Sequence, residues 1–356
     1  MATLLLVFLL ELGLSFGWNN PYLIVNESSS EHTRFNPKNM IAYAKVDRLY
    51  QGEHDIRFAI TQEMSVDGGK HYDSYESFAL GGSTTESGLV PEGQRWPDLL
   101  TAPALNYGVS GNTSIDGYYN LKYLIQNHQP PPKKVFVMFG INDLRAYFNK
   151  GADNFKIIGW KEPFHNPLAV IDQVNEKVLS GLRIKDSALL SFFKYQTENF
   201  LGRSFYASYY SERLNQEQME NISQAEFRNI LKIYREQFLP ARADVYKALS
   251  QLATNNNIKI ILLTQPHAYR EAYTAFLNDL RLYPVYKGKK LNLKQTALLL
   301  NEMNVQTKEL AELFGYKNVD TAKCFNKLSP SKLFYDSVHY TLEGSQQFAR
   351  CVNESL

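Results

Sequence analysis

The chain has 356 residues, which is long enough to bury a large core in one big domain or in two ordinary ones. Hydrophobic residues make up 44% and charged residues 21% of it, as is typical of a folded globular protein. The net charge is only +2, and nucleic-acid binding requires a basic surface, so we expect no nucleic-acid partner. The aromatic content of 13% suits a thick core, and it also suits contacts with sugars or acyl groups.

The chain begins with an apolar run that is too short to span a bilayer comfortably and is interrupted by Glu11. Ser15, Phe16 and Gly17 form a small-x-small cleavage site, although no basic residue precedes the apolar run. We therefore predict that residues 1–17 are a signal peptide or an N-terminal anchor, and that the protein is exported: secreted, periplasmic or membrane-anchored. Membrane association through the N-terminus belongs to this prediction, and a buried N-terminal helix is the alternative.

The only two cysteines, Cys324 and Cys351, lie near the C-terminus. In an exported protein they would form one disulfide that ties down this end, provided that the fold brings them together. Asparagine-x-serine sequons begin at Asn26, Asn112, Asn221 and Asn353. A glycan on Asn112 would be hard to reconcile with catalysis, because this residue lies in a candidate site loop.

Short apolar runs that end in polar or glycine-bearing loops recur along the chain and predict strands. They lie at residues 75–80, 104–108, 134–140 and 258–264, with 316–321 as the candidate for a fifth strand. Apolar spacing and helix-start signals predict helices over 114–127 and 341–353, a helix that starts near Arg95 with Pro97 in its first turn, and a short helix over 37–50. Residues 18–73 otherwise form a polar, turn-rich N-terminal extension.

Strands that alternate with helical stretches predict an α/β domain over residues 74–356 with a central parallel sheet of about five strands. Because right-handed crossovers bring the carboxyl ends of parallel strands to one edge, we expect catalytic groups there. Residues 145–238 form a segment much longer than a single crossover helix requires. The segment therefore predicts a helical insertion, with helices near 168–182, 188–201 and 224–238. Its many aromatic residues suit either a lid or wall of an acyl-binding or sugar-binding pocket, or a helical pair packed on the domain.

A candidate nucleophile follows the first of these strands, in the sequence Gly81-Gly82-Ser83. Glycines let the backbone turn sharply at the end of a buried strand and leave the serine hydroxyl exposed at the sheet edge. By itself this pattern is also that of an ordinary strand-to-helix turn. A serine hydroxyl is weakly acidic, so it needs a neutral base within hydrogen-bond reach and a carboxylate that orients the base.

Asp336 and His339, three residues apart near the C-terminus, supply a carboxylate and a base within one turn. Attack on an ester also develops a negative oxygen that needs preorganised hydrogen-bond donors. Three candidate donors lie at predicted strand ends: the backbone N–H groups of Ser83 and Gly111, and the side-chain amide of Asn142.

Four blocks of this sequence together resemble the SGNH hydrolase family, the GDSL-type esterases and lipases. They are the Gly81-Gly82-Ser83-Thr84-Thr85 turn, the glycine loop from Asn106 to Thr113, Gly140-Ile141-Asn142-Asp143, and Asp336-Ser337-Val338-His339. The resemblance implies a three-layer α/β/α, flavodoxin-like sandwich and a Ser-His-Asp triad. The chain departs from the pattern at Gly82, where many members carry aspartate, which puts substrate preference or local rigidity in doubt more than catalysis.

Three further residues are candidates for substrate binding because of their positions near these blocks: His267, Glu86 and Arg145. His267 follows the strand at 258–264 and equally suits a packed or capping role. The remaining histidines show no metal-ligand spacing, so we expect neither a metal nor another cofactor.

The predicted activity is hydrolysis of an ester through an acyl-enzyme on Ser83, with His339 as the base and Asp336 as its partner. The resemblance implies a small acyl ester, an acyl lipid or an O-acetyl glycan as the substrate. One alternative is O-acyl transfer to a glycan by the same triad, which an added polyol acceptor would reveal. Another is a non-catalytic binding module on the same fold, which a reactive-serine probe would fail to label.

Overall fold

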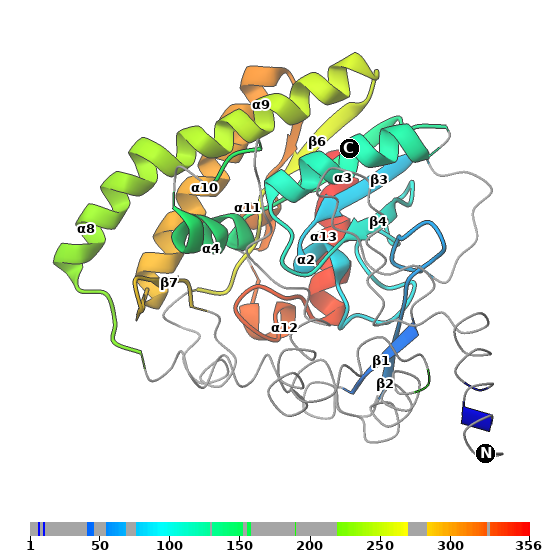
Figure 1. The fold of residues 1–356 in the computed structure, drawn as a ribbon, viewed down its shortest axis with the longest axis horizontal. Coiled ribbons are helices and arrows are strands. Elements are labelled where there is room, and N and C mark those ends of the chain that lie inside the picture. The colour runs from blue at the N-terminus through cyan, green and yellow to red at the C-terminus, as the bar shows by residue number, and fades with distance from the viewer. Residues whose placement is uncertain are drawn as a thin grey trace.

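The computed structural model describes residues 6, 7, 10, 41–45, 55–68, 76–128, 130–151, 155–157, 189, 219–269, 283–325 and 328–356. A parallel sheet of five strands forms its centre (Figure 1), with strand order β4-β3-β5-β6-β9. In chain order the strands are β3 (Ser77–Gly81), β4 (Leu105–Gly108), β5 (Lys134–Met138), β6 (Lys259–Leu263) and β9 (Lys317–Val319). All five predicted strands are therefore confirmed.

Side chains alternate across the sheet, as the pleat of a strand requires. One row, Leu80, Val137 and Leu262, is in register across β3, β5 and β6 and packs into the larger core cluster. The neighbouring row, Ala79, Phe136 and Ile261, points to the opposite face and belongs to a second cluster. Both faces are buried, which explains why the strands are almost continuously apolar.

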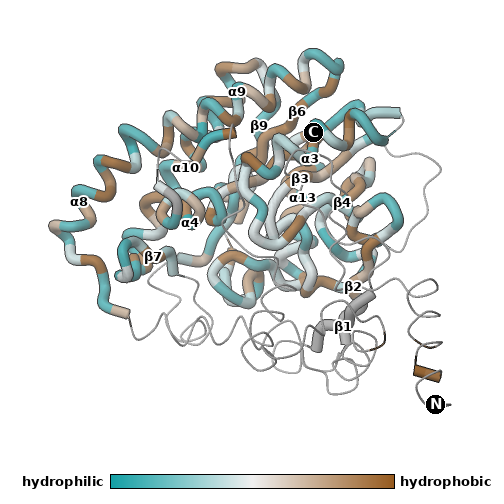
Figure 2. Tube along the Cα trace, viewed as in Figure 1, coloured by the Kyte–Doolittle hydropathy of each residue, from teal (hydrophilic) through white to brown (hydrophobic). Residues whose placement is uncertain are grey.

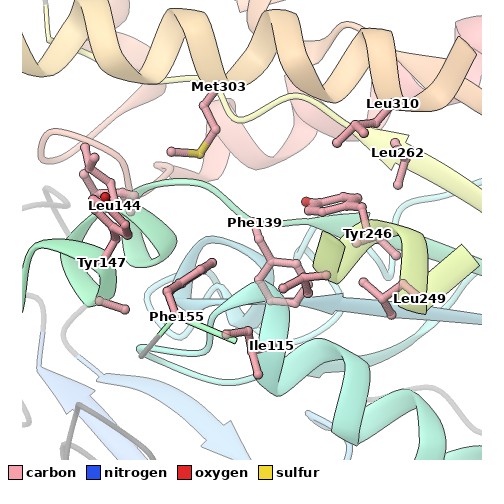
Figure 3. Packing of buried hydrophobic residues seen from close by; sticks show 14 of the residues in the cluster. Ile115, Phe139, Leu144, Tyr147, Phe155, Tyr246, Leu249, Leu262, Met303 and Leu310 are labelled. Carbon is pink, nitrogen blue, oxygen red and sulfur yellow. The ribbon is translucent and has the colours of Figure 1, made fainter. Parts of the chain in front are cut away.

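Helices cover both faces of the sheet, which confirms the α/β sandwich. On the first face lie α3 (Ser114–Asn127), α9 (Leu239–Asn255) and α10 (Leu293–Phe314), which pack against one another and against the sheet. Figure 3 shows Ile115 of α3, Leu249 of α9 and Met303 of α10 in this core. The hydropathy of these helices alternates along their length (Figure 2), as expected of helices that bury one side.

The second face carries α11 (Thr321–Phe325), α12 (Pro330–Leu333) and α13 (Leu342–Ser355). A disulfide between Cys324 and Cys351 ties α11 to α13, so the predicted pairing is confirmed. Phe348 of α13 is fully buried against Trp96, with ring centroids 4.8 Å apart. The C-terminal helix is thus fixed by a covalent bond as well as by packing.

The ends of the predicted insertion are ordered helices of the domain. The helix expected over 224–238 is confirmed as α8 (Gln224–Ile233) and a π-helical turn, η3 (Tyr234–Phe238), and the chain continues directly into α9. At the other end, α4 (Ile141–Lys150) follows β5. The helices expected near 168–182 and 188–201 lie outside the described residues but for Leu189, so the role of the insertion stays a prediction.

Two expected helices are wrong. Within 37–50 the chain forms a strand, β1 (Ile41–Lys45), which pairs antiparallel with β2 (Asp55–Ala59); Ile41 and Tyr43 alternate with alanines, a pattern that favours a strand. The segment that begins at Arg95 makes turns instead of a helix. Pro103, six residues after Pro97, has no N–H for a helical hydrogen bond, and the N–H of Ala104 donates to the Pro97 carbonyl at 3.1 Å.

Part of the N-terminal extension lies against the edge strand β4. The N–H of Val66 donates to the Asn106 carbonyl at 2.7 Å, and the Asp67 carbonyl accepts from Nη1 of the buried Arg95 at 2.6 Å. Phe58 of β2 faces the same guanidinium, 5.5 Å from ring centroid to Cζ.

A small antiparallel hairpin, β7 (Val285–Tyr286) and β8 (Lys289–Lys290), precedes α10.

None of the helices in the described ranges combines the length and apolar character needed to cross a membrane. Most of the predicted signal peptide lies outside those ranges, as does the sequon at Asn26. Among the other sequons, Asn112 is 1% exposed and the Asn353 amide bonds Leu99 and Thr101. Asn221 is exposed.

Candidate active site

The candidate nucleophile lies where β3 turns into α2 (Ser83–Glu86). A Cβ at Gly81 would overlap Thr85 Oγ1, and a Cβ at Gly82 would overlap the amide nitrogen of Asn142. Only glycines fit at these two positions without movement of their neighbours. The chain can therefore reverse tightly at the strand end, and Ser83 is left partly exposed as the first residue of the helix.

The structure brings Ser83, His339 and Asp336 into one hydrogen-bonded chain, as predicted. His339 Nε2 lies 2.6 Å from Ser83 Oγ, and His339 Nδ1 lies 2.7 Å from Asp336 Oδ2. Asp336 is completely buried, and its Oδ1 accepts the backbone N–H groups of Val338 and His339 at 2.8 and 2.7 Å. Because the Asp336 carboxylate accepts hydrogen bonds on both oxygens, it favours the imidazole tautomer that carries its proton on Nδ1. Nε2 can then accept the proton of the Ser83 hydroxyl.

The turn that carries Asp336 and His339 is fixed from three sides. Phe334 and Tyr340 form a β-bridge across it, and the Ser337 carbonyl accepts the N–H of Ala268 at 2.8 Å. The Tyr335 ring stacks on the His339 ring, with centroids 5.6 Å apart and planes 12° from parallel. The imidazole is therefore placed by its surroundings as well as by Asp336.

The predicted oxyanion donors meet at the same edge of the sheet, since β4, β3 and β5 are neighbours. Asn142 is the second residue of α4, is 7% exposed, and donates through Nδ2 to the Asn112 carbonyl at 3.1 Å. That carbonyl lies 3.3 Å from where a Cβ of Gly82 would stand. Gly111, beside Asn112, adopts a φ of 84°, which favours glycine. Asn142 and this glycine loop thus border the turn that presents Ser83.

Gln265 links the nucleophile turn to the Asn142 helix, a role that no sequence pattern predicted. Its Oε1 accepts the N–H of Ile141 at 2.7 Å, and its Nε2 donates to Thr84 Oγ1 at 3.3 Å. The Gln265 backbone is held in turn by the Asn304 amide, through bonds of 2.8 and 2.9 Å. One buried side chain therefore joins the residue after Ser83 to the residue before Asn142.

Asp143, next to Asn142, forms a buried ion pair with Arg242 of α9, at 3.1 Å. Its other oxygen accepts the N–H of Ser114, the first residue of α3, at 2.6 Å. Burial raises the pKa of Asp143, and the Arg242 guanidinium and the Ser114 N–H oppose that shift. Arg242 also donates to the Phe139 carbonyl, and it stacks on a tyrosine ring of its own helix. This network fixes α3 and α9 relative to the Asn142 turn.

The three candidate substrate-binding residues have different surroundings. Glu86 is 4% exposed, and its carboxylate accepts the Ser110 hydroxyl. His267 is 8% exposed, and its Nε2 lies 3.1 Å from Asn301 Oδ1 of α10. Arg145 is partly exposed and lies on α4 three residues after Asn142. Glu86 and His267 thus contact protein groups at the edge of the site, and substrate contact stays a prediction for all three.

Within the described ranges no three His, Cys, Asp or Glu side chains are grouped as metal ligands. His128, which is partly exposed, packs edge-on against the buried Phe78, with 4.8 Å between ring centroids. The other histidines that the sequence assigned no role, His32, His54, His71 and His165, fall outside those ranges.

No protein-family model and no curated protein matches the chain. Among solved structures it is similar to a lipolytic G-D-S-L family protein from Veillonella parvula, at 14% identity and a TM-score of 0.40 over 79% of this chain and 97% of that one. It is also similar to the acetylxylan esterase Axe2 from Geobacillus stearothermophilus (16% identity, TM-score 0.39, 79% and 94% covered) and to a GDSL-like lipase from Bacteroides thetaiotaomicron (16%, 0.38, 78% and 85%). The first and third of these names carry the G-D-S-L label of the family that the four blocks resemble.

Proposed function

We propose that the protein is a serine esterase of the SGNH type, with Ser83 as its nucleophile. The observation that carries this proposal is the hydrogen-bonded chain from Asp336 through His339 to Ser83, with separations of 2.7 and 2.6 Å. A buried carboxylate, an oriented imidazole and a partly exposed hydroxyl in this order are the arrangement that nucleophilic acyl transfer requires.

In the proposed reaction, Ser83 Oγ attacks the ester carbonyl while His339 Nε2 takes the hydroxyl proton. Asp336 stabilises the imidazolium that forms, and it remains ionised. Collapse of the tetrahedral intermediate breaks the ester bond, and His339 returns the proton to the leaving alcohol. A water molecule, deprotonated by His339, then attacks the acyl-enzyme. The second collapse breaks the bond to Ser83 Oγ and releases the acid, and His339 returns the proton to Ser83 Oγ.

The negative oxygen of both intermediates is stabilised by the N–H groups of Ser83 and Gly111 and by the Asn142 amide. Nδ2 of Asn142 carries two hydrogens, of which one serves the Asn112 carbonyl, and in this proposal the second donates to the oxyanion. In other enzymes the removal of one such donor lowers kcat by about 10²–10³-fold. All steps use groups of this chain, so the proposal includes neither metal nor cofactor.

We further propose that the protein is exported. The Cys324–Cys351 disulfide supports this, because disulfides persist mainly in oxidising compartments. The apolar N-terminal run supports it independently. The substrate proposed is an ester with a small acyl group, a lipid or an O-acetylated glycan.

The test is hydrolysis of p-nitrophenyl esters of increasing acyl length by the purified protein and by a Ser83→Ala variant. The variant is expected to lose at least about 10³-fold in kcat, since the triad acts as a unit. The chain-length profile of the wild type then distinguishes an acetyl-sized pocket from a long acyl pocket. Equal activity in both proteins, or a folded wild type that hydrolyses no ester, would refute the proposal.

A further inference from the structure

Glu86 makes a buried contact to the glycine loop that the proposed reaction does not use. It ends α2, the short helix that Ser83 begins, and its carboxylate accepts the hydroxyl of Ser110. Ser110 directly precedes Gly111, so the peptide bond between them carries the proposed oxyanion N–H. The side chain of Glu86 therefore reaches from the nucleophile helix to the residue that fixes this peptide.

The backbone from which Glu86 extends is held tightly against β4. A Cβ at Gly108 would overlap the Glu86 nitrogen, so the two backbones are in direct contact. Asn106 Nδ2 donates to the Thr85 carbonyl at 2.9 Å, and the Glu86 N–H donates to the Gly82 carbonyl at 3.0 Å. The carboxylate is thus fixed relative to both Ser83 and the end of β4.

Hydrogen bonds hold the glycine loop on both sides of the Ser110–Gly111 peptide. The N–H of Val109 donates to the Gly81 carbonyl at 3.1 Å, and the Asn112 carbonyl accepts from Asn142 Nδ2 at 3.1 Å. The N–H of Asn112 donates to the Val109 carbonyl at 3.0 Å and closes a turn around Ser110 and Gly111. Gly111 has no side chain and adopts a φ of 84°, a region that it enters and leaves without steric cost. Ser110 is only partly exposed, and its hydroxyl donates to the Glu86 carboxylate from within this turn.

A buried cation lies near Glu86. Arg95 is fully buried and interacts electrostatically with four carboxylates, most strongly with Asp98 and more weakly with Glu92, Asp67 and Glu86. Its Nη1 donates to the Asp67 carbonyl at 2.6 Å. A nearby cation favours the ionised form of a carboxylate, and an ionised carboxylate is a stronger hydrogen-bond acceptor than a neutral one.

We propose that Glu86 is a positioning residue that, through the Ser110 hydroxyl, aims the Gly111 N–H at the oxyanion formed on Ser83. The inference rests on the proposed esterase reaction and deepens it. It assigns Glu86 to the frame of the oxyanion site in place of the predicted contact with substrate. Its effect is on the chemical steps and not on substrate binding, because the negative oxygen is absent from the bound ester and develops only in the transition states and tetrahedral intermediates.

The test compares Ser110→Ala with Ser110→Thr, which removes or keeps the hydroxyl while Glu86 and Arg95 stay in place. Ser110→Ala is expected to lower kcat by about tenfold to 100-fold, less than complete loss of a donor, with KM within about twofold of wild type. The affinity for a boronic acid that mimics the tetrahedral intermediate is expected to fall by the same factor as kcat/KM. Ser110→Thr is expected to stay within about threefold of wild type, and Glu86→Gln, which keeps an acceptor oxygen, is expected to fall between the two.

Thermal unfolding of each variant shows whether a loss of activity reflects folding. Wild-type kcat in Ser110→Ala, a loss confined to KM, or an equal loss in Ser110→Thr would overturn the role of Glu86. In that case an active wild type and an inactive Ser83→Ala still support the esterase. An inactive wild type, or an active Ser83→Ala, overturns both proposals.

Discussion

A substitution at Gly82 would move the Asn142 amide, one of the proposed oxyanion donors, without changing any reacting group. The Gly82 backbone is extended, with φ of −88°, a value that alanine adopts without strain. The obstacle to a side chain is the Asn142 amide. A Cβ on residue 82 would lie well within 3.0 Å of the Asn142 amide nitrogen, and real Cβ atoms do not come so close to such an atom. In a Gly82→Ala variant the amide must therefore retreat by about 1 Å to reach ordinary van der Waals distance.

We expect this movement to lower the catalytic rate more than it lowers the stability of the fold. The atom in the way is the end of a side chain, so the overpacking is expected to cost about 1–2 kcal/mol of unfolding free energy. A displacement of 1 Å at a reacting centre costs about 10²-fold in rate, close to the loss expected when the donor is removed. The Gly82→Ala variant is therefore expected to fold and to lose about 10²-fold in kcat.

A double-mutant cycle with Asn142→Ala tests whether the effect acts through the amide. The assay is kcat/KM on p-nitrophenyl acetate for the wild type, both single variants and the double variant, with thermal unfolding as the control. Because the amide is absent in Asn142→Ala, adding Gly82→Ala is expected to cost no more than about threefold. Additive losses in the double variant, or wild-type kcat in Gly82→Ala, would refute this reasoning.

Three further outcomes are expected. Cys351→Ser removes the disulfide to Cys324, which closes a loop of 27 residues, and should lower the unfolding free energy in urea by about 3.5 kcal/mol. An unchanged midpoint of the urea transition would contradict this. Asp143→Ala leaves the Arg242 guanidinium buried without its carboxylate and should lower the unfolding free energy in urea by about 3–5 kcal/mol. A loss under about 1 kcal/mol would contradict this expectation. Gln265→Met keeps the volume but loses both side-chain bonds, so kcat should fall more than KM rises, whereas a pure KM effect would argue against a role in positioning.

The sheet and three helical segments could be predicted closely because their signals are local. These segments are α3, α8 with η3, and α13, which the sequence placed at 114–127, 224–238 and 341–353. Helix α3 begins and ends where the sequence indicated, since Thr113 and Asp116 form a capping box at its start and prolines follow its end. Helix α10, with 22 residues, was not predicted. Three of its apolar side chains, Leu298, Val305 and Leu313, are exposed and blur the periodicity that marks an amphipathic helix.

The site shows the same division between local and distant information. The motif blocks predicted Ser83, Asp336 and His339 because the chemistry itself selects these residue types. Gln265 and Arg242 could not be predicted, because their roles depend on partners 124 and 99 residues away. A buried glutamine or arginine has many structural uses, and only the packed fold decides which one applies.

The contact between Val66 and Asn106 bears on how the chain can be shortened. A protein that begins at residue 74, the domain start expected from sequence, would lack this hydrogen bond and the Asp67 carbonyl that Arg95 uses. The outer side of β4 would then present unpaired backbone groups, a surface on which strands of other molecules add and aggregates grow. A shortened chain that keeps residues 55–68 retains a protected sheet edge, so the extension serves solubility as well as packing.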